Sequence, residues 1–144
     1  SGIRGLNITI TAFNGNHRGD ACSVYPLLKS GQPVHARINL TPRGGTPLAP
    51  ALWWGMQQLL FTREQRKMLL VLTDGQPHDM NATQKSIEIA NKIGLEVYGL
   101  GMLDRSISDF LPDTSRVICR LEELPAMLFE LLHDVLTRKS RPCL

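Results

Sequence analysis

The chain has 144 residues, of which 42% are hydrophobic, and this size and apolar content suit one domain with a shared core. The 16 basic and 13 acidic residues give a net charge of +3 without a long basic run, which argues against nucleic-acid binding. Three cysteines without a CxxC pair, no leader-like start and no apolar stretch of ~20 residues predict a soluble, cytoplasmic domain that does not contact a membrane.

The amino-terminal part predicts two strands joined by a long loop. Leu6 to Phe13 alternates apolar and polar residues and is rich in β-branched ones, which is the pattern of a half-buried strand. Residues 14–32 are polar and are interrupted by glycine and proline, so we predict an exposed, irregular connection there. Val34 to Leu40 alternates again and predicts a second strand, antiparallel to the first and at the edge of a sheet.

Helical and extended patterns alternate in the rest of the chain. Leu48 to Phe61 carries apolar residues at helical spacing, and Pro47 suits the start of that helix. The apolar run Met68 to Thr73 is typical of a strand buried on both faces of a parallel sheet. The other predicted elements are a helix over 81–93, a buried strand over 95–101, a short helical turn over 104–111, a short strand over 117–119 and a final amphipathic helix over 121–138.

This order of elements predicts the fold class. We expect an α/β fold with a Rossmann-like open sheet, mostly parallel with an antiparallel edge strand, helices on both faces, and a single domain over residues 1–144. Ligands of such sheets bind beyond the carboxyl ends of the strands. Two loops expected at that edge carry oxygen-bearing side chains, Gly44-Gly45-Thr46-Pro47 and Thr73-Asp74-Gly75-Gln76-Pro77. Hydroxyl and carboxylate oxygens suit a hard cation such as Mg²⁺.

These two segments, in this order, resemble the second and third motifs of a von Willebrand factor A domain, and the similarity extends over almost the whole chain. The resemblance implies an adhesion site that depends on Mg²⁺, or on Mn²⁺ in its place, with Thr46 and Asp74 as the metal ligands. A protein partner would complete the metal shell with a carboxylate. The residues implied to meet that partner are Gly45, Gly75, Gln76, His78 and Asp79.

Two further features of the resemblance concern partners. Arg63-Glu64-Gln65-Arg66-Lys67 and Pro77-His78-Asp79 are most similar to the bacterial branch found on cobaltochelatase-like subunits, which implies an AAA+ ATPase as partner. The family's first strand and first helix, with its Asp-x-Ser-x-Ser motif, are missing ahead of Leu6. Two side chains and solvent make a weak site for an ion that takes about six oxygens. The missing strand would also leave a sheet edge exposed, so we expect self-association through that edge.

Simpler structural roles remain open for several of these residues. Thr46 could close a turn, and Asp74 could cap the helix after Gly75. For Asp79 a cap or turn role is favoured over a ligand role, and His78 is favoured as a solvated loop residue. A second match to the motif, Asp104-Arg105-Ser106-Ile107-Ser108, precedes a short helical turn, so an N-cap role is expected for its first residue.

Three classes of function therefore stand side by side. The first is a protein–protein interaction module with a partial metal site, and catalysis is not expected of it. The fingerprints of serine hydrolases, phosphate loops, zinc proteases and dinucleotide enzymes are absent from the sequence. The second class is a metal-independent, self-associating scaffold or fragment. The third is a metal-assisted hydrolase around Asp74, although the sequence places no second carboxylate or nucleophile beside it.

Overall fold

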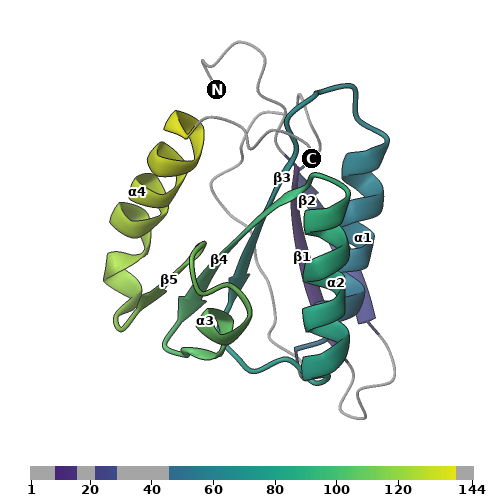
Figure 1. Cartoon of the computed structure of the whole chain (residues 1–144). Helices are drawn as coiled ribbons and strands as arrows, with labels where there is room; N and C mark the ends of the chain where they lie inside the picture. Colours follow the sequence, from purple (N-terminus) through teal and green to yellow (C-terminus); the bar gives the residue numbers. More distant parts are fainter. Residues whose placement is uncertain (1–8, 16–21, 29–45, 139–144) are drawn as a thin grey trace.

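The computed structural model describes residues 9–15, 22–28 and 46–138, and its main body is a three-stranded parallel sheet with helices on both faces (Figure 1). The strands of this sheet lie in the order β3–β4–β5 and span Met68–Thr73, Glu96–Met102 and Ser115–Ile118. The helices are α1 (Leu48–Leu60), α2 (Met80–Lys92), α3 (Ser106–Phe110) and α4 (Leu124–Thr137). The predicted α/β class and open sheet are confirmed.

The carboxyl ends of the three strands lie level with one another. Thr73, the last residue of β3, pairs with Gly101, and the next residue of β4, Met102, pairs with Ile118 at the end of β5. Parallel neighbours must be joined by a crossover, and each connection here runs through a helix. All three strands therefore end on one edge of the sheet, which we call the carboxyl rim.

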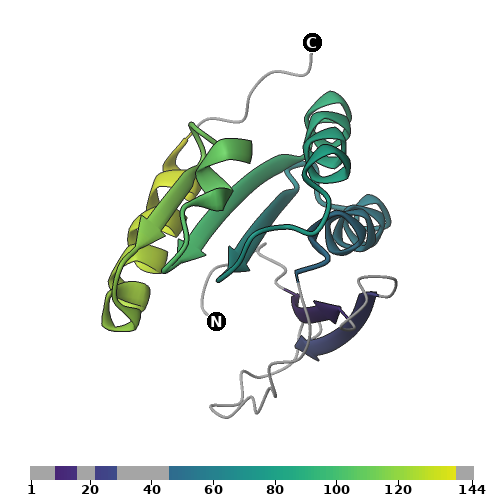
Figure 2. The ribbon, with the colours of Figure 1, turned by 90° about the horizontal axis from the view of Figure 1, so that it is seen from below.

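Two apolar layers hold the helices against the sheet, as Figure 2 shows from below, with α1 and α2 on one side and α4 on the other. The first layer joins buried residues of α1, α2, α3 and the strands, including Leu48, Met56, Ile87, Val97 and Ile107. The second joins β4 and β5 to α4 through Tyr98, Leu100, Ile118, Leu131 and Val135. Burying one such large side chain contributes about 1.5–3 kcal/mol, so these layers supply most of the driving force for folding.

Two glycines of β4 allow the short helix α3 to pack directly on the strand. A Cβ atom on Gly99 would lie 2.5 Å from Cγ1 of Ile107, and one on Gly101 would collide with the carbonyl oxygen of Asp104. No larger residue fits either position without displacing its neighbours. The close packing of α3 on β4 thus fixes the path of the chain from the end of β4 to β5.

The helix boundaries follow from local chemistry. The carboxylate of Asp79 accepts a hydrogen bond from the backbone N–H of Ala82 at 2.8 Å, which caps α2. Gly94, with φ of 82°, ends the same helix in a left-handed conformation. The predicted start of the last helix at residue 121 is wrong, because Leu121–Glu123 forms a 3-10 turn and α4 begins at Leu124, with Pro125 in its first turn.

The amino-terminal part forms a separate antiparallel pair of strands, β1 (Ile10–Gly15) and β2 (Cys22–Leu28). The prediction of an irregular connection over 14–32 is wrong over β2, because extended segments with β-branched and aromatic residues pair readily even when they contain one proline near an edge. Phe13 packs against the first apolar layer, so this pair lies next to α1, as Figure 2 shows. The predicted strand over 34–40 lies outside the described residues, as do residues 6–8.

Candidate functional site

The structure brings together the two loops that the sequence predicted at the carboxyl rim. Thr46 forms an isolated parallel β-bridge with Pro77, four residues beyond the end of β3. The carbonyl oxygen of Thr46 accepts hydrogen bonds from the backbone N–H groups of His78, at 3.1 Å, and Leu48, at 2.9 Å. These backbone contacts hold the start of α1 beside the loop after β3.

The Thr46 hydroxyl lies against the residue that follows Asp74. A Cβ atom built on Gly75 would be 3.0 Å from Thr46 Oγ1, so a side chain at this position would require the hydroxyl to move by a few tenths of an ångström. The Asp74 side chain is exposed, and among the described residues neither its carboxylate nor the Thr46 hydroxyl has a hydrogen-bond partner. The Thr46 hydroxyl and the Asp74 carboxylate, which make no hydrogen bond to the described residues, thus belong to two loops that meet at Gly75.

Thr73 holds the loop that carries Asp74. Its side chain is buried, with 6% exposure, and its hydroxyl both donates to the carbonyl oxygen of Gly75 at 3.1 Å and accepts from the N–H of Gly75 at 3.3 Å. This local turn directs the residue between them toward solvent. Sequence reasoning assigned no role to Thr73, although a threonine two residues before a glycine at a strand end is a signal for such a turn.

The other residues predicted to bind a partner have different positions and roles in the structure. Gln76 and His78 are exposed at the carboxyl rim, whereas Gly45 lies outside the described residues. The Asp79 carboxylate is engaged as the cap of α2, as favoured from sequence, and this leaves no capping role for Asp74. The structure therefore removes the simplest structural explanation for the Asp74 carboxylate.

The second match to the motif is a structural turn. The carboxylate of Asp104 accepts a hydrogen bond from the backbone N–H of Ser106 at 2.7 Å, which stabilises the turn ahead of α3. The expected N-cap role is wrong in its position, because Arg105 is the N-cap of α3 and Asp104 lies one residue before it. Hydrogen bonding from the side chain of Ser106, and from its backbone N–H, favours the charged carboxylate and lowers the pKa of Asp104 below its ordinary value. The same carboxylate is therefore already occupied in the turn that begins α3.

The donor set at the rim fits a hydrated hard cation. One hydroxyl and one carboxylate are oxygen ligands, and Mg²⁺ commonly binds to a protein through one or two carboxylates while it keeps several waters. Within the described segments no group of three or more His, Cys, Asp or Glu side chains comes close enough to enclose an ion. Thr46 and Asp74 could therefore hold Mg²⁺ only with solvent or a partner supplying the other oxygens.

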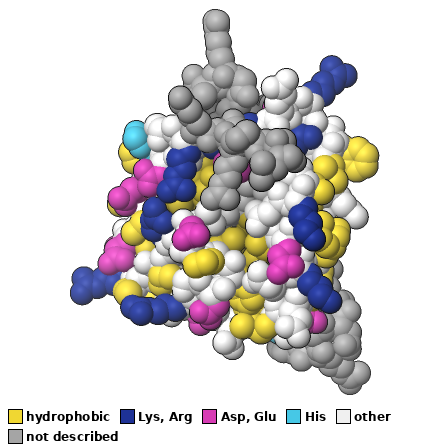
Figure 3. All heavy atoms as spheres, viewed as in Figure 1, with side chains coloured by type: hydrophobic (Ala, Val, Ile, Leu, Met, Phe, Trp, Pro, Cys, Tyr) yellow, Lys and Arg dark blue, Asp and Glu magenta, His cyan; other side chains and the backbone are white. Residues whose placement is uncertain are grey.

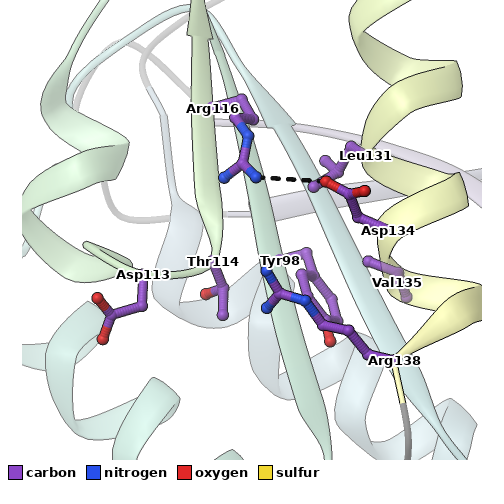
Figure 4. Close-up of a pocket in the computed structure, with 8 residues that line it drawn as sticks. All are labelled: Tyr98, Asp113, Thr114, Arg116, Leu131, Asp134, Val135 and Arg138. Carbon is purple, nitrogen blue, oxygen red and sulfur yellow. Dashed lines mark ion pairs between the residues drawn. The ribbon is translucent and has the colours of Figure 1, made fainter.

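A hollow between β5 and α4, shown in Figure 4, is filled by its own lining. Arg116 forms an ion pair with Asp134 across it at 3.5 Å, and the side chains of Tyr98, Leu131 and Val135 leave no room for a water molecule. Figure 3 shows that acidic and basic side chains are interspersed on the visible face, with no region of a single sign among the described residues. Neither the filled hollow nor the mixed charge of this face indicates a ligand.

A more open depression lies on the carboxyl rim. It has a volume of about 170 Å³ and lies between the ends of β4 and β5, where it is lined by Leu103, Arg105, Val117, Ile118 and Cys119. None of the sequence patterns marked this place, because its lining comes from segments that are separate along the chain. The carboxyl rim therefore carries two features within one surface, the Thr46–Asp74 pair and this depression.

Comparisons of the chain with family models, with curated proteins and with solved structures gave no match. The helices in the described part of the chain all lack the length and apolar content that crossing a membrane requires.

Proposed function

We propose that this chain is a protein–protein interaction module of the von Willebrand factor A type, acting in the cytoplasm of a bacterium. Its contact surface is the carboxyl rim, where Thr46 and Asp74 hold a Mg²⁺ ion that receives a carboxylate from the partner. No catalytic role is proposed. The observation that carries this proposal is the approach of the Thr46 hydroxyl to Gly75, the residue that follows Asp74, whose exposed carboxylate has no partner among the described residues.

The chemistry of the two side chains supports a cation rather than a direct protein contact. A hydroxyl without a hydrogen-bond partner, lying next to the residue that follows an exposed carboxylate, provides oxygens of the type that Mg²⁺ binds. A bound Mg²⁺ supplies a positive charge that attracts an acidic group on another protein. The chelatase-like character of residues 63–67 and 77–79 favours an AAA+ ATPase as that protein.

Metal titration of single variants tests the proposal. Mn²⁺ can stand in for Mg²⁺ and is detected by electron paramagnetic resonance, with competition by Mg²⁺ as the second readout. Thr46→Val keeps the shape of the side chain and removes its hydroxyl, and Asp74→Asn removes the charge. Each variant is expected to weaken Mn²⁺ binding by at least about tenfold, since a metal held by so few side chains depends on every one.

The matched control is Asp113→Asn, because Asp113 is an exposed carboxylate remote from the Thr46–Asp74 pair and makes no hydrogen bond or ion pair among the described residues. This variant should bind Mn²⁺ as the parent chain does. If Thr46→Val and Asp74→Asn bind the ion as tightly as the control, the metal site is not at the carboxyl rim and the proposal is wrong.

A self-associating scaffold is the second candidate, and one observation favours it. β3 is apolar from Met68 to Leu72 and, within the described residues, pairs only with β4, while Leu72 on it is 41% exposed. Apolar strands with an unpaired edge readily add another strand. A second copy related by a two-fold axis would place the two β3 strands antiparallel and extend the sheet across both molecules.

Sedimentation velocity separates this candidate from a monomeric module. Leu72→Lys places a charge on β3 and is expected to convert a dimer into a monomer, since a lysine on an edge strand opposes pairing. The control is Leu60→Lys, which changes a comparably exposed leucine at the end of α1, at 53% exposure. A monomer at every protein concentration, or a dimer that survives Leu72→Lys, would rule out this edge as the contact.

A further inference from the structure

The depression on the carboxyl rim has the size and lining of a receptor for one aliphatic side chain. Its volume of about 170 Å³ equals that of several water molecules, each of which occupies roughly 30 Å³ in the liquid. The Ile118 side chain in the lining is fully buried, so the accessible apolar side chains are those of Val117 on β5 and Leu103, which follows β4. An apolar group placed there would exchange contact with water for contact with these side chains.

Leu103 is held in an unfavourable conformation that keeps its side chain at this place. It has a φ of 64°, in the left-handed region that residues other than glycine and asparagine rarely adopt, and it is 63% exposed. Its N–H donates to the carbonyl oxygen of Ile118 at 2.9 Å, which fixes the turn. A strained, exposed leucine at the mouth of a depression indicates a position used for binding, because folding alone would be served better by glycine.

The positive charge of Arg105 beside the depression favours a ligand that carries an acidic group next to its apolar side chain. The Arg105 side chain is exposed and makes no ion pair with any residue of the described segments. Among the carboxylates nearby in sequence, Asp104 accepts from Ser106 N–H at 2.7 Å and Glu123 accepts from Cys119 N–H at 3.3 Å. Asp109 and Glu122 are exposed, and neither forms an ion pair with Arg105 within the described segments. The guanidinium at the rim is therefore free to pair with a carboxylate from another molecule.

We infer that the depression binds a partner segment in which an aliphatic side chain stands next to a carboxylate, with the aliphatic group between Leu103 and Val117 and the carboxylate on Arg105. The inference deepens the proposed protein-binding function and rests on it, because it names what the partner must offer beside the carboxylate that meets the metal. It does not depend on the metal itself.

The two contacts lie within reach of one partner segment. Thr73 at the end of β3 is level with Gly101 of β4, and Met102 is level with Ile118 of β5. Neighbouring strands are about 4.8 Å apart, so the depression lies roughly 5–10 Å along the rim from the end of β3. An extended segment rises about 3.3 Å per residue, and two or three residues of a partner would therefore span from the Asp74 loop to the depression.

Nuclear magnetic resonance with short peptides tests the inference. The ¹⁵N-labelled chain is titrated with N-acetyl-Glu-Leu-amide to concentrations on the order of 10 mM, which detects weak contacts. Amide shifts are expected at residues 103–105 and 117–119, both with Mg²⁺ and with the metal chelated. N-acetyl-Lys-Leu-amide and N-acetyl-Glu-Ser-amide should produce clearly smaller shifts, because one lacks the carboxylate and the other lacks the aliphatic group.

Two variants assign the peptide contact to its residues. Leu103→Asn introduces a residue that also tolerates positive φ, so the fold should be retained. Because the new side chain is polar, the amide shifts caused by N-acetyl-Glu-Leu-amide should be lost. Arg105→Gln should weaken binding by about two- to fivefold, the usual effect of losing one exposed ion pair. Arg63→Gln changes an exposed arginine at the opposite edge of the sheet and serves as the matched control.

The outcomes separate the inference from the proposed function. If peptide binding depends on Leu103 and Arg105 but the chain binds no Mn²⁺, the depression is supported as a binding site and the metal site is refuted. Shifts that map elsewhere, that are equal for the three peptides, or that survive Leu103→Asn would overturn the inference, whatever the metal titration shows.

Discussion

Arg66 and Glu96 form a two-point ion pair that joins the loop before β3 to the start of β4. Arg66 Nε lies 2.7 Å from Glu96 Oε2, and Arg66 Nη2 lies 3.0 Å from Glu96 Oε1. The same guanidinium donates to the carbonyl oxygens of Val135, at 2.7 Å, and Arg138, at 3.0 Å, at the end of α4. One side chain therefore ties two parallel strands to the helix that covers them.

Replacing Arg66 should destabilise the fold. Arg66→Met removes the ion pair and leaves the partly buried carbonyl oxygen of Val135 in α4 without this donor, so we expect a loss of about 2 kcal/mol in the free energy of unfolding, measured with urea. Arg66→Lys should lose less unfolding free energy than Arg66→Met, because an ammonium group keeps the charge but cannot make the two-point contact with Glu96. Arg63→Met is the control and should change stability by less than about 0.5 kcal/mol. A loss equal to that of the control would show that the network contributes nothing.

The free energy of unfolding should fall at alkaline pH in part through Tyr98. Its hydroxyl donates to Glu96 Oε1 at 2.9 Å, and burial, together with this hydrogen bond, raises the pKa of Tyr98 above its ordinary value. The folded chain holds the phenol proton more tightly than the unfolded chain, so this contribution is complete below the unfolded pKa of about 10 and disappears as the pH rises through the folded pKa.

Ultraviolet titration of the phenols measures this effect. The chain has two tyrosines, and Tyr25→Phe leaves Tyr98 as the only phenol to be observed. The midpoint of its titration in the folded chain should lie above the midpoint in urea. Urea unfolding at increasing pH then compares Tyr25→Phe with Tyr25→Phe/Tyr98→Phe. The corresponding alkaline loss of unfolding free energy is expected only in the chain that keeps Tyr98. Equal midpoints in the two states would contradict the expected shift.

The two glycines of β4 should not tolerate a methyl group. Gly99→Ala forces a Cβ atom toward Ile107, and Gly101→Ala forces one onto the backbone carbonyl of Asp104, so each should cost about 1–3 kcal/mol of stability through overpacking. Gly101→Ala should be the more harmful, because a backbone atom yields less easily than a side chain. Thermal unfolding followed by circular dichroism measures both, and unchanged melting of the two variants would mean that α3 does not pack on β4 as described.

Gly75→Ala should weaken metal binding more than it weakens folding. Its Cβ atom would lie 3.0 Å from Thr46 Oγ1, so the hydroxyl must move by a few tenths of an ångström while the core stays intact. We expect Mn²⁺ affinity to fall toward that of Thr46→Val, with a change in unfolding free energy below about 1 kcal/mol. Full Mn²⁺ affinity in a folded Gly75→Ala chain would show that the position of the hydroxyl does not matter for the ion.

The cap of α2 provides a prediction that is independent of the metal. Asp79→Ala removes the acceptor of the Ala82 N–H and should cost about 1 kcal/mol, whereas Asp79→Asn keeps an acceptor and should cost only a few tenths. Urea unfolding distinguishes the two variants, and Asp113→Ala is the matched control. Equal stability of all three chains would exclude a capping contribution.

The local patterns of the sequence determined the elements around the parallel sheet. The apolar run of β3 and the helical spacing of α1 are properties of consecutive residues, so their predicted limits agree with the structure to within one residue. The same holds for α2, where Asp79 begins the helix and Gly94 ends it through chemistry that acts over one turn. The pairing of Thr46 with the loop after β3 was also foreseeable, because parallel strands end at a common edge.

Only the tertiary structure decided the contacts between segments distant along the chain. The guanidinium of Arg66 meets Glu96 and Val135, which are 30 and 69 residues away, and no periodicity encodes such a meeting. The depression beside Leu103 likewise needs β4 and β5 side by side. The physical reason is that periodicity and capping act over a few residues, whereas surfaces and ion pairs form where packing of the whole core places the backbone.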